Sequence, residues 1–158
     1  GILFNHESPR RGETFVTSKI VKGLVNYKKH KQTLFLGNLN AKRDWGHAKD
    51  YMYAAWKILQ YKKPDDFCIG SETQYSVRDF VNKVANKLNI KIFWKGVGLN
   101  EKGYDQENNL VVSIDPRYFR PSEVDTLLAD TNKAKKLLGW NYQFNLDELI
   151  DEMISSEL

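Results

Sequence analysis

The chain has 158 residues, of which 28% are charged and 41% hydrophobic, and its formal net charge is +4. These values are typical of a globular domain with a sizeable core. No window approaches the roughly 18 apolar residues of a membrane-spanning helix, and we expect no secretory leader. The single cysteine, Cys68, excludes an internal disulfide and fits a reducing compartment. We therefore expect a cytoplasmic protein without a membrane partner.

Apolar runs and amphipathic segments alternate along the sequence. Runs at 2–4, 33–37, 67–70, 91–94 and 110–114 predict short strands, because turn-forming or polar residues bound them. Helical spacing of apolar residues follows the first three runs. The predicted apolar stripes are Val16, Ile20, Leu24 and Tyr27; Ala48, Tyr51, Ala55 and Leu59; and Val77, Phe80, Val81, Val84 and Leu88. The alternation of strand and helix predicts an α/β fold.

Capping residues mark the later helices. Ser76 and Asp79 have the spacing of a capping box at the start of the third helix. Gly139 predicts the end of a short fourth helix. Asn145 and Glu148 have capping-box spacing again and predict the start of a last helix.

Polar segments separate these elements and are predicted to be loops. They span residues 38–46, 96–109 and 115–130. The second is rich in glycine, so we expect it to be mobile.

The stretch 5–14 lies between the first predicted strand and the first predicted helix. Ligands of α/β sheets bind at the carboxyl ends of strands, and helix N-termini present unpaired amide protons to anions. Arg10 and Arg11 add guanidinium groups, which bind phosphate bidentately. A basic loop is more often solvated surface, and a lone His6 more often makes structural hydrogen bonds. With the two basic loops described next, the stretch predicts half of a nucleotide site.

Two further loops carry arginines. Arg43 lies in the first polar segment, and residues 115–124 combine prolines, arginines and a carboxylate. The second loop is either a salt-bridged surface loop or a clamp, in which guanidinium groups bind a diphosphate and a carboxylate accepts from sugar hydroxyls. Three basic loops at strand ends suit a diphosphate better than a monoanion.

Other familiar patterns are absent or misleading. The histidines and the cysteine have no metal-ligand spacing, and no serine-hydrolase elbow occurs. Gly96 and Gly98 follow a strand, but no apolar helical stripe follows them. Tyr53 and Lys57 have the spacing of a dehydrogenase catalytic pair, yet packing and surface charge explain them better. The basic residues are scattered, and the sequence lacks an RNA-binding signature, so we expect no nucleic-acid partner.

Several long sequence motifs resemble those of GDP-mannose 4,6-dehydratases. They are NHESPRRGETFVT at 5–17 and RDWGHAKDY at 43–51, supported by 74–78, 115–124 and 136–140. The resemblance implies the carboxyl-terminal part of an extended short-chain dehydrogenase. Such a part holds the end of the Rossmann sheet and a smaller mixed α/β domain that binds the substrate.

The resemblance also implies a division of labour. Residues 1–158 would form the nucleotide-sugar binding portion with returning Rossmann elements, while the NADP-binding amino-terminal half and the catalytic residues lie outside this chain. The intact protein would convert GDP-mannose to GDP-4-keto-6-deoxymannose with NADP, as a homo-oligomer (a dimer or a tetramer). We expect this chain by itself to be inactive.

Site residues are implied position by position. The resemblance places Asn5 beside the diphosphate and sugar, Lys19 on the nucleotide and Gly37 near the base. It further implies contacts of Arg43 and Arg120 with the diphosphate, of Glu123 with a ribose hydroxyl, and of His6 and Arg11 with NADP. It implies no metal ligand. The alternatives are a non-catalytic nucleotide-sugar binding module, another GDP-sugar dehydratase or epimerase, and, more remotely, a basic RNA-binding domain.

Overall fold

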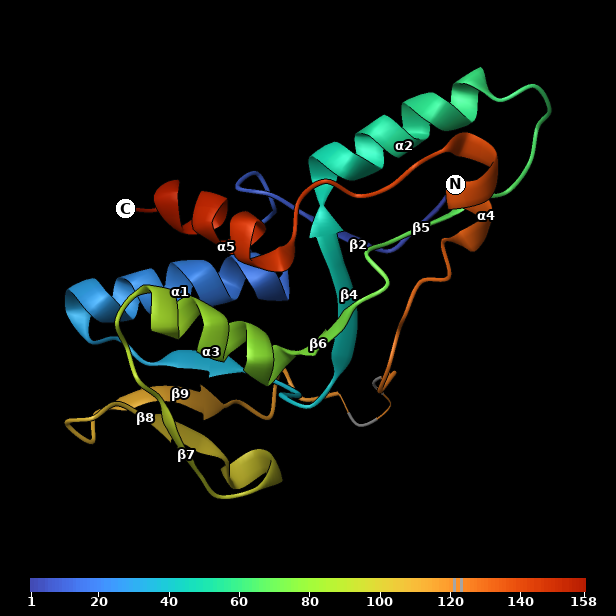
Figure 1. The fold of residues 1–158 in the computed structure, drawn as a ribbon. Coiled ribbons are helices and arrows are strands. Elements are labelled where there is room, and N and C mark those ends of the chain that lie inside the picture. The colour runs from blue at the N-terminus through green and yellow to red at the C-terminus, as the bar shows by residue number, and fades with distance from the viewer. Residues whose placement is uncertain (121, 123) are drawn as a thin grey trace.

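The computed structural model describes residues 1–120, 122 and 124–158. Short strands alternate with helices in the first two thirds of the chain, and two helices close it (Figure 1). In chain order the elements are β1 (Ile2–Leu3), β2 (Asn5–Glu7), α1 (Val16–His30), β3 (Leu34–Leu36), β4 (Lys42–His47), α2 (Ala48–Gln60), β5 (Cys68–Ile69), β6 (Gln74–Ser76), α3 (Val77–Lys87), β7 (Phe93–Lys95), the 3₁₀ turn η1 (Gly98–Asn100), β8 (Lys102–Tyr104), β9 (Leu110–Ile114), α4 (Asn132–Leu138) and α5 (Leu146–Ser155). The predicted α/β class is confirmed.

The described strands form three small sheets. The largest has the order β3-β9-β8-β7, with β3 parallel to β9 and the remaining pairs antiparallel. The second has the order β2-β4-β6, in which β2 runs parallel to β4. The third is the parallel pair β1 and β5. The carboxyl end of β3 borders the site described below.

The main core lies between three helices and the four-stranded sheet. Helices α1, α3 and α5 pack on one another, and α1 and α3 lie beside the sheet (Figure 1). Ile20 and Leu24 of α1, Phe80 and Val84 of α3, and Leu149 of α5 are fully buried. Each such side chain contributes about 1.5–3 kcal/mol of burial free energy.

A smaller core surrounds Trp140. Its indole packs with Tyr51 and Phe67, and its Nε1 donates a hydrogen bond of 3.1 Å to the Asp50 carbonyl oxygen. This cluster joins α2, β5 and α4 at the opposite end of the molecule from β7 and β8 (Figure 1). The predicted stripe of α2 is partly wrong, because Tyr51 and Ala54 are its buried apolar residues and Leu59 is 81% exposed.

The predicted caps are confirmed. Ser76 with Asp79 and Asn145 with Glu148 both form complete capping boxes. Gly139 ends α4 in the left-handed conformation, with φ of 59°. These local signals need no tertiary context, which is why the sequence reveals them.

The predicted loop at 38–46 is wrong over its second half, because β4 occupies Lys42–His47 and is the central strand of its sheet. The sequence pattern misses this strand because the strand contains a buried carboxylate. Asp44 is fully buried and accepts hydrogen bonds from Ser71 N (2.7 Å), Ser71 Oγ (2.7 Å) and Glu72 N (2.9 Å). A satisfied buried Asp hides the strand from any apolar pattern.

The predicted mobile loop at 96–109 is also wrong in part. It contains η1 and the strand β8, which pairs with both β7 and β9. Asp105 anchors its end by accepting from Tyr27 Oη (2.7 Å) and from the Asn109 backbone N–H (2.8 Å). The segment is therefore part of the sheet rather than a free loop.

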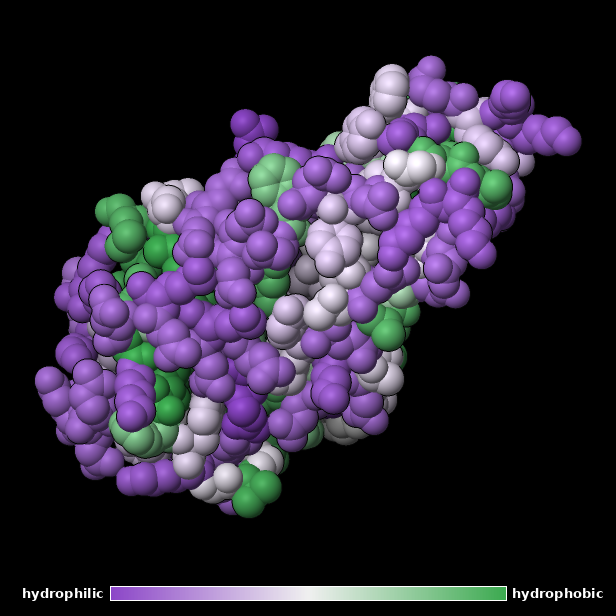
Figure 2. All heavy atoms as spheres, viewed as in Figure 1, coloured by the Kyte–Doolittle hydropathy of each residue, from purple (hydrophilic) through white to green (hydrophobic). Residues whose placement is uncertain are grey.

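One face of α2 remains apolar and exposed. Trp56 is 55% exposed, and Met52, Tyr53 and Leu59 lie with it on the helix side opposite Tyr51. The neighbouring strand β1 also exposes its side chains. The face of the molecule in Figure 2 is hydrophilic over most of its area, and only small areas of it are hydrophobic. No described helix is long and apolar enough to cross a membrane.

Candidate functional site

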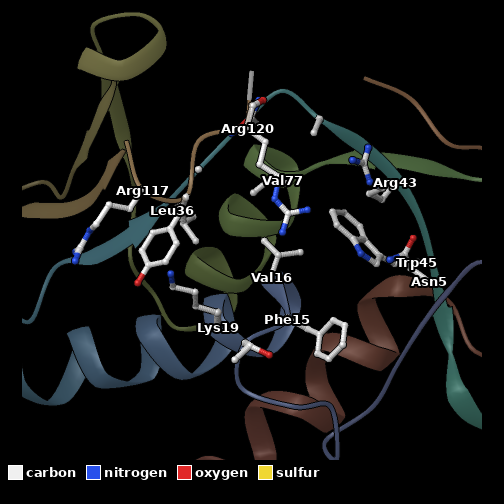
Figure 3. Close-up of a pocket in the computed structure, with 15 residues that line it drawn as sticks. Asn5, Phe15, Val16, Lys19, Leu36, Arg43, Trp45, Val77, Arg117 and Arg120 are labelled. Atoms are coloured by element: carbon white, nitrogen blue, oxygen red, sulfur yellow. The ribbon is translucent and has the colours of Figure 1, made fainter. Parts of the chain in front are cut away.

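A cavity of about 520 Å³ lies at the start of α1 and the end of β3. Its volume is within the ordinary range for small-molecule sites. Asn5 and Trp45 reach it from neighbouring parallel strands, since they are partners in the β2–β4 ladder. The lining residues are Asn5, Thr14, Phe15, Val16, Lys19, Leu36, Gly37, Asn38, Ala41, Arg43, Trp45, Val77, Arg117, Tyr118 and Arg120 (Figure 3).

The cavity combines a positive rim with an apolar floor. Lys19, Arg43 and Arg120 supply cationic groups, and the described lining residues include no carboxylate. Trp45 and Val77 are buried beneath them. Such a site attracts an anion and at the same time offers packing surface to a ring.

The N-terminus of α1 borders the same cavity. Thr14, Phe15 and Val16 line the cavity, and the helix has no side-chain cap and no acidic residue in its first turn. The first N–H groups of a helix have no partner within it. An anion at this end would be stabilised by those groups and by the helix dipole.

Arg43 connects β4 to the segment that contains Val124. Its Nη1 donates hydrogen bonds of 2.7 Å to the carbonyl oxygens of Lys42 and Val124. The backbone pairs alongside, with Lys42 N donating to Asp125 O at 2.8 Å. Arg43 is therefore oriented at the cavity by the segment that follows Arg120.

The turn 115–120 carries two arginines with different partners. Arg117 donates to Asp115 through Nη2 (2.7 Å), Nε and its backbone N–H. These bonds hold the pKa of the Asp115 carboxyl below its ordinary value. In Figure 3 the Arg117 side chain points away from the cavity, and that of Arg120 extends into it toward Val77 and Val16. The guanidinium of Arg120 has no ion-pair or hydrogen-bond partner among the described residues.

Gly37 lets this turn rest on the end of β3. A Cβ at this position would lie 2.1 Å from the Tyr118 carbonyl oxygen, a distance that no side chain tolerates. Asp115 N donates to Leu36 O at 2.9 Å and continues the strand pairing up to the turn. Lys19 completes the enclosure, with its Nζ 3.3 Å from the centroid of the Tyr118 ring.

His6 and Arg11 lie outside the cavity. His6 Nδ1 is 3.0 Å from the Phe4 carbonyl oxygen, and its ring stacks on Tyr51. Arg11 Nε is 3.0 Å from Glu7 Oε2, and its guanidinium lies 3.6 Å above the Phe15 ring. Burial raises the pKa of Glu7 above its ordinary value, against the opposing effects of its Thr17 hydrogen bond and of Arg11.

The structure thus brings together five of the eight site residues that the resemblance implies. Asn5, Lys19, Gly37, Arg43 and Arg120 all line one cavity. His6 and Arg11 form a separate group, and Glu123 lies outside the described residues.

Several lining residues were missed from the sequence. Asn38 has a signal that could have found it, because it directly follows Gly37 at a strand end. Trp45 has none, since its segment was taken for a loop. Tyr53 and Lys57 do not line the cavity, and Lys57 Nζ instead donates to the Leu138 carbonyl oxygen at 2.9 Å. The part of the chain that the structure describes holds no cluster of His, Cys, Asp or Glu suited to a metal ion.

The fold is that of the carboxyl-terminal part of an extended short-chain dehydrogenase. RMD from Pseudomonas aeruginosa, solved in complex with NADPH, superposes with a TM-score of 0.79 at 16% identity. The superposition covers 98% of this chain and 46% of RMD. At this level of identity the likeness establishes the fold alone.

The sequence comparisons establish the family. The family model for GDP-mannose 4,6 dehydratase matches residues 1–153, and the chain belongs to this family. A GDP-mannose 4,6-dehydratase of Vibrio cholerae is 48% identical over 170 residues, which cover all of this chain and 46% of the relative. GDP-mannose 4,6 dehydratase 2 of Caenorhabditis elegans is 48% identical over 159 residues, which cover all of this chain and 42% of the relative. The chain thus spans a little under half the length of these relatives.

Proposed function

We propose that this chain is the substrate-binding portion of a GDP-mannose 4,6-dehydratase, a lyase that converts GDP-mannose to GDP-4-keto-6-deoxymannose with NADP. One observation carries the proposal: in a chain of this family, three cationic side chains from separate elements meet at a single cavity free of described carboxylates. A diphosphate bears two negative charges in a small volume and suits such a rim.

Each cavity residue has a role in this proposal. Arg43 and Arg120 bind the diphosphate, helped by the unpaired N–H groups of the first turn of α1. Lys19 contacts the nucleotide from the same helix. Gly37 lies near the base, and Asn5 contacts the sugar next to the diphosphate. The buried ring of Trp45 and the neighbouring aliphatic side chains form the floor beneath the ligand.

Glu123 belongs to the proposal as well. Its carboxylate accepts a hydrogen bond from a ribose hydroxyl. The residue lies outside the described part of the chain, so this role rests on the family resemblance alone.

NADP is assigned to His6 and Arg11, which lie outside the cavity. Their geometry fits a ligand contact. The Phe4 carbonyl oxygen can only accept, so a neutral His6 carries its proton on Nδ1 and leaves Nε2 as an acceptor. Arg11 is held by Glu7 on one edge, while its Nη groups have no hydrogen-bond partner among the described residues. When bound, NADP supplies hydride acceptance and return, and these residues hold and orient it.

The catalytic residues and the rest of the NADP site are proposed to lie in an amino-terminal half. Two observations support a missing neighbour. β1 has a single partner strand among the described residues, so one edge of it is unpaired in a two-stranded sheet, which is marginally stable by itself. Helix α2 is apolar on two sides, of which the one with Trp56 is exposed. The amino-terminal half would add strands beside β1 and cover α2, and the intact protein would form a dimer or a tetramer.

Two arginine variants of the intact protein test the substrate site. By intact protein we mean this chain joined to its amino-terminal half. Arg120→Ala should raise the KM for GDP-mannose by about 10- to 150-fold, because a charge-assisted hydrogen bond is worth about 1.5–3 kcal/mol. Arg117→Ala is the matched control and should leave KM within about twofold, since Asp115 already holds Arg117. Equal effects of the two variants would refute the diphosphate assignment.

Turnover by this chain tests the division into halves. The chain alone, given GDP-mannose and NADP, should yield no 4-keto product. Detectable product would place the catalytic residues within residues 1–158.

A further inference from the structure

The side chain of Asn38 is bound to the backbone of Arg120. Asn38 Oδ1 accepts from Arg120 N at 2.8 Å, and Asn38 Nδ2 donates to Arg120 O at 3.1 Å. One carboxamide thus satisfies both polar groups of a single peptide residue 82 positions away. Only Asn or Gln offers a donor and an acceptor with this spacing, and Gln is one methylene longer.

These two bonds act at the end of a turn that is otherwise held before Arg120. Asp115 closes its first half by binding Arg117, and Phe119 packs against the main core. Gly37 allows the Tyr118 carbonyl to lie close to β3. None of these contacts fixes the backbone of Arg120 itself, so the Asn38 carboxamide is the described contact that does.

The direction of the Arg120 side chain depends on this backbone contact. Its guanidinium has no partner among the described residues, so no ion pair holds the side chain over the cavity. A long unpaired side chain on a free backbone loses much of its binding energy to the ordering of its rotamers. Holding the peptide units on both sides of its Cα removes part of that cost before the ligand arrives.

We propose that Asn38 is a positioning residue for Arg120 and sets how tightly the intact protein holds the diphosphate of its nucleotide ligand. The inference rests on the proposed function, because it takes Arg120 to bind the diphosphate. Asn38 adds nothing to the recognition of the base or the sugar. Its contribution therefore exists only while Arg120 is present.

The experiment measures inhibition of the intact protein by GDP and by guanosine. Asn38→Ala should weaken GDP inhibition about fivefold, the value of two neutral hydrogen bonds at the lower end of their range. It should leave guanosine inhibition within about twofold. In an Arg120→Ala background the same substitution should change GDP inhibition by less than about twofold.

Further variants separate positioning from other roles. Asn38→Ser keeps a polar group too short to reach both Arg120 atoms and should behave as Asn38→Ala does. Asn26→Ala is the matched control, because Asn26 bonds only to the exposed Gln32 side chain among its described neighbours and should change neither inhibitor.

Three results would overturn the inference. If inhibition by GDP and inhibition by guanosine weaken equally in Asn38→Ala, Asn38 acts through the base or through the general fold. If the effect persists without Arg120, Asn38 contacts the ligand directly. If GDP inhibits both Asn38 variants as strongly as it inhibits the wild type, the carboxamide has no role in binding. An Arg120→Ala variant with normal GDP inhibition is a different result, because it refutes the diphosphate assignment itself.

Discussion

The turn after β2 and the turn after β9 both carry arginines at the end of a strand, yet the structure uses them differently. At the first turn Arg11 is ion-paired with the buried Glu7 and lies flat on Phe15. At the second, Arg117 is ion-paired with Asp115, and the guanidinium of Arg120 has no described partner. An arginine paired with a carboxylate has only part of its guanidinium available to a ligand, whereas the whole guanidinium of Arg120 is available.

The difference has an energetic consequence. An anion that binds Arg11 must share the guanidinium with Glu7, and the two negative charges repel each other. An anion that binds Arg120 meets no described carboxylate in the cavity. The second turn is therefore the stronger anion site, and the first suits a contact that uses only one edge of the guanidinium.

The largest expected effect comes from Gly37→Ala, which attacks the support of the second turn. The added Cβ would lie 2.1 Å from the Tyr118 carbonyl oxygen, so the turn must move away from β3. We expect a loss of about 1–3 kcal/mol in the free energy of unfolding. We also expect a rise in the GDP inhibition constant at least as large as that of Arg120→Ala. Urea unfolding and inhibition assays of the intact protein measure both.

A matched glycine controls for that substitution. Gly12 belongs to the first turn, and an added Cβ there would lie 3.4 Å from Phe15 Cδ2, an ordinary contact. Gly12→Ala should change the free energy of unfolding by less than about 0.5 kcal/mol. Normal GDP inhibition in Gly37→Ala would show that the close contact of the second turn with Gly37 does not matter for binding.

The next effect distinguishes the two turns by ligand. Arg11→Lys keeps a positive charge beside Glu7 but loses the planar fork. It should raise the KM for NADP about tenfold and leave the KM for GDP-mannose within about twofold. Arg10→Lys is the control, since Arg10 is exposed and makes no described side-chain contact. If Arg11→Lys raises both KM values equally, the division between a cofactor turn and a substrate turn fails.

Local patterns predicted much of the fold and part of the site. The capping boxes at Ser76 and Asn145 depend on residues within one turn, so their spacing alone identifies them. The apolar stripes of α1 and α3 are equally local. Arg43 and Arg120 were found because both lie in polar segments of the sequence that follow predicted strands. Both line one cavity, although Arg43 lies in the strand β4 rather than in a loop.

What the sequence did not predict depends on contacts far along the chain. β4 was missed because Asp44 is satisfied by a turn 27 positions later. The pairing of Arg11 with Glu7 cannot be read from the order of the residues, since Arg10 is closer to Glu7 in sequence than Arg11 is. Asn38 is a similar case, because its partner is 82 positions away.

The smallest expected effect is a pH dependence of the free energy of unfolding that comes from Glu7 in the first turn. Burial raises the pKa of Glu7 above its ordinary value of 4.5, so between these two values the folded protein binds more protons than the unfolded chain. The free energy of unfolding therefore falls as pH rises from 4.5 through the raised pKa, by at most about 1.4 kcal/mol per pH unit for one group. Glu7→Gln removes this titration, so the stability of the wild type relative to the variant should fall across that window and stay constant above it.

Glu13 provides a control of opposite sign for the same measurement. It is exposed, and its hydrogen bond from Lys22 lowers its pKa below 4.5. Its contribution to stability is present above pH 4.5 and is lost as pH falls through the lowered value. Relative to Glu13→Gln, the wild type should therefore gain stability as pH rises. Urea unfolding of each variant across pH 3–8 measures both differences, and a Glu7 difference with the sign of Glu13 would mean that Arg11, rather than burial, controls the carboxylate of the first turn.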